Sequence, residues 1–154
     1  KQQLKTNDNS FSQLKLKIDR NLISKVKDKV HTNISFNEQN VTGLFFSCEV
    51  DCIGLNGSFT GAKAIDFSRS EQTIKKEISN YISLSRILEN NYNRYGKKNN
   101  YYMITDEPKK MNSKEQLWDS IRKLENFTII KPEKSDIVVD EIEQKQSKRF
   151  LAVN

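Results

Sequence analysis

Apolar residues recur every three or four positions between residues 11 and 30. The stripe consists of Phe11, Leu14, Ile18, Leu22, Val26 and Val30. A spacing that returns every apolar side chain to one face is typical of an amphipathic helix, and Asn9 or Ser10 can cap its first turn. The opposite face carries a run of lysine and arginine, which is either a solvated surface or a contact for nucleic acid.

A second helix is predicted after Ser68, because Ser68 and Glu71 have the spacing of a capping box. Apolar residues follow at helical spacing, and Gly96 supplies the stop signal. A third, shorter helix is predicted over residues 113–124, with its apolar side chains on one side.

Short runs rich in β-branched and aromatic residues predict the strands. They cover residues 43–55, 62–68, 101–105, 127–130 and 136–142, while residues 31–42 form either a loop or a short strand. The Asn-Gly turn between the first two runs predicts a hairpin. The expected order is α-β-β-α-β-α-β-β, which indicates an α/β or α+β domain with one mixed β-sheet flanked by helices.

The 154 residues have the length of one domain. We expect a flexible N-terminal segment at 1–10, a single domain at 11–145 and a polar C-terminal tail at 146–154. Because the chain begins with Lys1, we interpret it as a fragment of a larger protein. Other protein chains, or the remainder of that parent protein, are therefore expected partners. No apolar run approaches the length of a transmembrane helix.

The two cysteines, Cys48 and Cys52, lie four residues apart in a predicted strand. Such positions are separated by about 13 Å in an extended chain, which is too far for a disulfide. We interpret both as reduced, buried thiols and place the protein inside the cell, in cytoplasm or nucleus.

The formal net charge of +6 permits binding to nucleic acid, although lysine-rich composition can also reflect coding bias. RNA and DNA are equally compatible with this charge. The candidate contacts are Lys15, Lys25 and Lys29 on the first helix, and Lys97 and Lys98 after the second.

Three carboxylates accompany the predicted hairpin. Glu49 and Asp51 are two residues apart, so a regular strand would place them on one face, and Asp66 lies on the neighbouring strand. Clustered carboxylates repel one another unless a cation lies between them, and Mg²⁺ or Mn²⁺ suits oxygen ligands. Alternatively, Glu49 and Asp51 face solvent on an edge strand, and Asp66 accepts hydrogen bonds at the entry of the next helix.

The stretch "VDCIGLNGSFTGAKAIDFSRSE" resembles the core hairpin of the PD-(D/E)XK nuclease superfamily. In that hairpin an acid on one strand is followed by acid-x-Lys on the next, and Asp51 and Asp66 match the two acids. "CEVDCI" also resembles a signature of the cap-quality-control decapping exonucleases. The resemblance implies a metal-dependent nuclease in which Glu49, Asp51 and Asp66 hold Mg²⁺ or Mn²⁺.

The lysine of acid-x-Lys would stand at position 68, which is Ser68. Lys63, Lys75 and Lys76 are the candidates to replace it and to stabilise transition-state charge. The related cap-snatching endonucleases sometimes add a histidine ligand on a preceding helix, which suggests His31 as a metal ligand; otherwise His31 is a loop residue. We therefore predict a nuclease-like domain that acts on or binds nucleic acid. The alternative is a non-catalytic interaction or scaffold module, built on a degenerate nuclease fold or an unrelated α+β fold.

Overall fold

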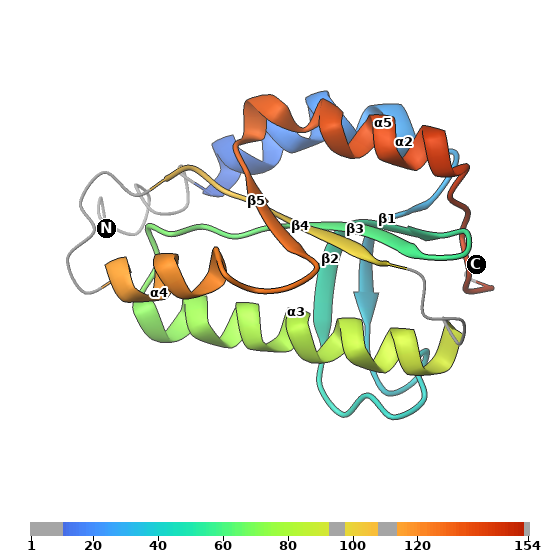
Figure 1. Cartoon of the computed structure of the whole chain (residues 1–154), viewed down its shortest axis with the longest axis horizontal. Coiled ribbons are helices and arrows are strands. Elements are labelled where there is room, and N and C mark those ends of the chain that lie inside the picture. Colours follow the sequence, from blue (N-terminus) through green and yellow to red (C-terminus); the bar gives the residue numbers. More distant parts are fainter. Residues whose placement is uncertain (1–10, 93–97, 108–113, 153–154) are drawn as a thin grey trace.

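The computed structural model describes residues 11–92, 98–107 and 114–152. It has an α+β fold, in which a mixed five-stranded sheet is covered by helices on both faces (Figure 1). The strands are β1 (His31–Phe36), β2 (Cys48–Leu55), β3 (Phe59–Ala64), β4 (Asn100–Ile104) and β5 (Phe127–Ile130), and they are hydrogen-bonded in this order.

The sheet changes direction in its middle. β1, β2 and β3 pair antiparallel, whereas β3, β4 and β5 pair parallel. Parallel neighbours require a crossover connection. Along the chain, helix α3 (Glu71–Tyr92) connects β3 to β4, and α4 (Glu115–Ile121) connects β4 to β5.

The two faces carry different helices. Residues 11–18 are α-helical and continue through the π-helical turn η1 (Asp19–Ile23) into α2 (Ser24–Val26). We call this continuous element the first helix. It packs beside α5 (Asp136–Lys145) on one face, while α3 and α4 cover the other (Figure 1). A 3₁₀ turn, η3 (Pro132–Lys134), precedes α5.

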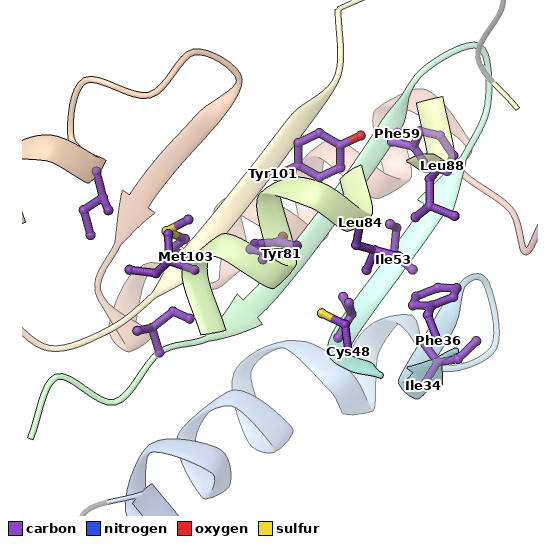
Figure 2. Packing of buried hydrophobic residues seen from close by; sticks show 14 of the residues in the cluster. Ile34, Phe36, Cys48, Ile53, Phe59, Tyr81, Leu84, Leu88, Tyr101 and Met103 are labelled. Carbon is purple, nitrogen blue, oxygen red and sulfur yellow. The ribbon is translucent and has the colours of Figure 1, made fainter. Parts of the chain in front are cut away.

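The larger core lies between the sheet and α3. Figure 2 shows side chains from the sheet, including Phe59, Tyr101 and Met103, packed against Tyr81 and Leu84 of α3. The Tyr81 hydroxyl donates a hydrogen bond of 3.2 Å to the backbone oxygen of Tyr102. A buried phenol needs such a partner, so this contact fixes α3 over β4.

The fold class and most of the predicted elements are confirmed, but residues 136–142 form helix rather than strand. Val138, Val139 and Ile142 are buried at helical spacing against the sheet. A short β-branched run cannot distinguish the two structures by its pattern. Two further boundaries differ: the predicted strand 43–55 begins only at Cys48, and the strand expected at 62–68 runs from Phe59 to Ala64.

Residues 31–36 are strand β1, which decides between the loop and the strand expected there. The segment expected as a polar C-terminal tail contacts the domain. Lys148 forms an antiparallel bridge with Leu55, and the Phe150 ring packs against Phe36 and Phe59.

Among the described helices, none combines the length and apolar character that crossing a bilayer requires.

Candidate functional site

A pocket of about 280 Å³ opens where the first helix meets β2 and β3. Its polar lining consists of Lys15, Asn33, Glu49, Asp51, Lys63 and Glu77. The structure therefore brings together four of the predicted site residues, Lys15, Glu49, Asp51 and Lys63. It adds Asn33 from β1 and Glu77 from α3, which the sequence pattern did not indicate. We call this site the Asp51 pocket.

The Asp51 carboxylate is held by protein groups on both oxygens. Its side chain is only 5% exposed and forms an ion pair through Oδ1 with the ammonium group of Lys15. Its Oδ2 accepts a hydrogen bond of 2.6 Å from the backbone N–H of Ala64. The paired register of β2 and β3 ends at Cys52 and Ala62, so the carboxylate binds the adjacent strand beyond the last paired residues.

The prediction that Glu49 and Asp51 share a face assumed regular alternation along β2. Val50 and Ile53 both contribute to the core under α3, whereas Cys52 belongs to the opposite core. Regular alternation would place Val50 and Ile53 on opposite faces, so the strand is irregular around Asp51. As a result Asp51 is buried and Glu49 is exposed, although both line the pocket.

The three candidate lysines lie in different surroundings. Lys63 is buried on β3, and its ammonium group donates a hydrogen bond of 2.5 Å to the backbone oxygen of Glu49. Lys75 is exposed on α3 and pairs with Glu71 at 3.0 Å, and Lys76 is exposed on the same helix. Of the three, Lys63 is the one that lines the Asp51 pocket.

If Lys63 is read as the lysine of an acid-x-Lys element, the acid's position is occupied by Gly61. A Cβ atom at Gly61 would lie 3.3 Å from side-chain carbons of Ile53 and 3.4 Å from the Tyr101 ring. This position therefore faces the apolar core, and a carboxylate there would be directed away from water.

Asp66 lies beyond the end of β3 and is absent from the pocket lining. Its Oδ1 accepts hydrogen bonds from the backbone N–H of Ser68 at 2.9 Å and from the Ser68 hydroxyl at 2.7 Å. Its Oδ2 is 3.8 Å from Nε of Arg69. These contacts stabilise the turn that leads into α3, as the alternative helix-entry role requires.

His31 is buried in β1 and holds the C-terminal segment. Its Nε2 accepts hydrogen bonds of 3.1 Å from the backbone N–H groups of both Phe150 and Leu151. Burial lowers the pKa of His31, and the nearby Arg149 lowers it further. An Nε2 that accepts two hydrogen bonds belongs to a neutral imidazole with its proton on Nδ1. It is not among the residues that line the Asp51 pocket.

The predicted metal ligands do not come together around one cation. Within residues 11–92, 98–107 and 114–152, no three His, Cys, Asp or Glu side chains come together as a metal site. Asp51 has both oxygens engaged, and Asp66 stabilises a separate turn. Asp51 and Asp66 therefore do not form a shared divalent-cation site in this structure.

A second cluster of charge lies at the C-terminal end of the first helix. Arg149 donates a hydrogen bond of 2.5 Å from Nη2 to the backbone oxygen of Lys27, which joins two segments that are far apart in the sequence. We call the five basic residues gathered there the basic end: Lys25, Lys27, Lys29, Lys148 and Arg149. The acidic residues beside it are Asp28 and Glu143, and Glu143 pairs with Lys29 at 2.9 Å.

The basic end contains Lys25 and Lys29 of the predicted nucleic-acid contacts. Lys15 instead lies in the Asp51 pocket, Lys98 is exposed beside β4, and Lys97 lies outside the described residues. Sequence reasoning missed Lys148 and Arg149, because nothing local indicates that the C-terminal segment folds back onto the helix.

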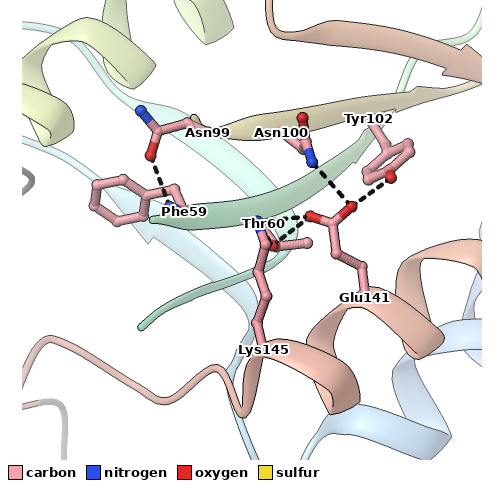
Figure 3. Close-up of polar contacts among 7 residues, drawn as sticks. All are labelled: Phe59, Thr60, Asn99, Asn100, Tyr102, Glu141 and Lys145. Carbon is pink, nitrogen blue, oxygen red and sulfur yellow. Dashed lines mark hydrogen bonds and ion pairs between the residues drawn. The ribbon is translucent and has the colours of Figure 1, made fainter. Parts of the chain in front are cut away.

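Glu141 of α5 occupies the centre of a polar cluster on the sheet (Figure 3). It accepts hydrogen bonds from Thr60 at 2.6 Å, Tyr102 at 2.7 Å and Asn100 at 3.1 Å, and it pairs with Lys145 at 3.1 Å. Burial raises the pKa of Glu141, but the hydrogen bonds and Lys145 outweigh burial and bring it below its usual value. The cluster docks α5 on β3 and β4.

The two cysteines are free and buried, as the sequence predicted. Burial raises the pKa of Cys52 to about 12 and also raises that of Cys48. Both are therefore protonated, weakly reactive thiols at neutral pH.

Comparisons of the chain with protein-family models, with curated proteins and with solved structures find no match.

Proposed function

We propose that this chain is a nuclease-like domain that binds nucleic acid at its basic end and does not cleave it at the Asp51 pocket. The observation that carries the proposal is the contact between Arg149 and the Lys27 backbone, which brings the basic C-terminal segment against the lysine-rich end of the first helix. Such a cluster attracts the phosphate backbone of RNA or DNA. The net charge of +6 acts in the same direction.

The order of elements supports the nuclease-like assignment. A helix precedes antiparallel strands, and a helix and a parallel strand follow the hairpin. This is the layout that the PD-(D/E)XK resemblance implies. Asp51 and Lys63 also lie on neighbouring strands and line one pocket.

Two departures from the acid-x-Lys pattern favour a degenerate site. Gly61 stands two residues before Lys63, and Asp66 is used by a turn. Internal contacts also engage both oxygens of Asp51, the carboxylate that matches the first acid of the pattern, so neither oxygen is free to hold a metal ion for hydrolysis. The proposed role is therefore binding, and the basic end is separated from the pocket. Lys15 lies near the start of the first helix, whereas Lys27 follows its last residue, Val26.

The proposal is tested by removing charge from the basic end. In the triple variant Lys25→Gln/Lys27→Gln/Lys148→Gln we expect weaker binding to fluorescein-labelled single-stranded RNA and DNA. The slope of log K against log salt should also become shallower, by about 0.7 for each lost phosphate contact on a single strand. Fluorescence anisotropy at several salt concentrations measures both quantities.

A matched control removes the same charge elsewhere. Lys75, Lys76 and Lys123 are exposed and lie on or after helices α3 and α4. The variant Lys75→Gln/Lys76→Gln/Lys123→Gln should therefore bind more tightly than the basic-end variant. Equal losses in the two triple variants would show that only total charge matters and would contradict a defined site.

A second candidate is an interaction module within a larger intracellular assembly. The observation that favours it is Phe45, whose side chain is 85% exposed in the loop between β1 and β2. The free, buried cysteines suit a reducing compartment. A photo-crosslinking residue at position 45 should then capture one defined protein in cells, and capture of no defined protein would contradict this role.

A further inference from the structure

We infer that Lys15 is a built-in counter-cation, whose ammonium group takes the place on Asp51 that a divalent cation would take in a metal-dependent site. The Asp51 pocket is then complete without metal. This inference concerns the pocket alone and is independent of nucleic-acid binding at the basic end.

The contacts of Asp51 define the place of this cation. One oxygen is fixed by the Ala64 N–H at 2.6 Å, and the other pairs with Lys15. Lys15 is the partner that could leave, because its side chain is 31% exposed against 5% for Asp51. An acid as buried as Asp51 needs a partner of opposite charge to remain ionised.

The charges of the pocket show why one ammonium group is needed. Three carboxylates, from Glu49, Asp51 and Glu77, line it together with Lys15 and Lys63. The Lys63 ammonium donates to the backbone oxygen of Glu49, whereas Lys15 contacts the Asp51 carboxylate directly. These five groups sum to one net negative charge, and without Lys15 they would sum to two, which is the charge that one divalent cation neutralises.

The neighbours of Lys15 keep it in this role. On balance the pKa of Lys15 is lowered, chiefly by burial and also by Lys63, and the carboxylates of Asp19 and Glu49 oppose this shift. Asp19 lies four residues further along the first helix, at the spacing at which helical side chains interact. The ammonium group therefore pairs with Asp51 of β2 and is also favoured by the charge of Asp19 on its own helix.

The test removes the charge of Lys15 and keeps its length. Lys15→Met retains the apolar stem, and Lys15→Arg is the control that retains the charge. We expect the wild type and Lys15→Arg to give no saturable heat with Mn²⁺ in calorimetry, and the same melting temperature in EDTA and in Mn²⁺. Lys15→Met should melt at a lower temperature than the wild type in EDTA, because Asp51 loses its partner. Mn²⁺ should raise the melting temperature of this variant, because one or two carboxylates together with water are enough to bind such an ion.

The double variant Lys15→Met/Asp51→Asn identifies the carboxylate responsible, since it should lose the Mn²⁺ response. Two results would overturn the inference. One is saturable Mn²⁺ binding to the wild type that Asp51→Asn abolishes, because Lys15 would then be a displaceable occupant. The other is a folded Lys15→Met protein that does not respond to Mn²⁺. Should Lys15→Met fail to fold, the wild-type melts in EDTA and Mn²⁺ decide, since the inference requires them to coincide.

Discussion

Acidification should weaken the domain through its one histidine. His31 accepts two hydrogen bonds from the backbone of the C-terminal segment through Nε2, and its pKa is lowered by burial and by Arg149. Protonation of His31 would put a hydrogen on Nε2, where it would face the N–H groups of Phe150 and Leu151 that now donate to this atom. It would also add a positive charge near the guanidinium group of Arg149. The neutral form is therefore the one that holds Phe150 and Leu151 in place.

The sign and the size follow from proton linkage. Because the folded pKa is below the usual 6.5, the stabilisation is complete above about pH 6.5 and is lost as the pH falls toward the folded value. A single proton limits the slope to about 1.4 kcal/mol per pH unit. Two hydrogen bonds of ordinary strength contribute about 1–3 kcal/mol in total, which bounds the loss when the segment is released.

The assay is urea unfolding between pH 5 and 7.5 for the wild type and His31→Gln. Glutamine keeps an acceptor oxygen but does not titrate, and the chain has no second histidine. Carboxylates and the N-terminal amine titrate in both proteins, so the difference between the two free energies isolates His31. It should change by less than about 1.4 kcal/mol per pH unit, with the wild type losing more in acid. Parallel curves, or a wild type that gains stability in acid relative to His31→Gln, would refute the reasoning.

Three further outcomes concern stability and are measured by urea unfolding at pH 7.5. Glu141→Gln should lower the free energy of unfolding by about 1–3 kcal/mol, because it weakens the polar cluster on α5. The control is the exposed neighbour, since Asp140→Asn should change the free energy of unfolding by less than about 0.5 kcal/mol. Equal effects of the two substitutions would contradict the role of the cluster. Gly54→Ala should cost about 1–3 kcal/mol, because its Cβ would lie 2.4 Å from Cγ1 of Val30. A neutral result would show that the Val30 side chain moves away at no cost. Phe45→Ser should be within about 0.5 kcal/mol of the wild type, since its ring is 85% exposed, and a large loss would place that ring in the core.

The long helices could be predicted because their apolar stripes continue over several turns. The stripe from Leu14 to Val26 is buried as expected, whereas Phe11 is partly buried. The helix α3 also forms, but it begins at Glu71 and its cap is Ser70, which accepts the Thr73 N–H at 3.2 Å, rather than Ser68 of the predicted capping box. Residues 136–142 could not be assigned in the same way. Their β-branched residues fit either a strand or a helix over so short a run, and packing of Val138 and Ile142 on the sheet decides for helix.

The candidate site was predicted in part, because its residues belong to one hairpin. Asp51, Glu49 and Lys63 line one pocket as neighbours in the sheet. The place of Asp66 depends on where β3 ends, and the apolar residues Ile65 and Phe67 on either side of it extend the strand-like pattern past that end. The partner of Asp51 comes from a helix 36 residues away, and such a pairing leaves no local pattern in the sequence.

The most direct test of the account is binding of a labelled oligonucleotide in EDTA and in Mn²⁺, followed by electrophoresis of the same samples. The account predicts equal affinity in both conditions, weaker binding in the basic-end variant, and an intact oligonucleotide. Cleavage in Mn²⁺ that is lost in Asp51→Asn would contradict it, because the Asp51 pocket would then be a metal-dependent active site.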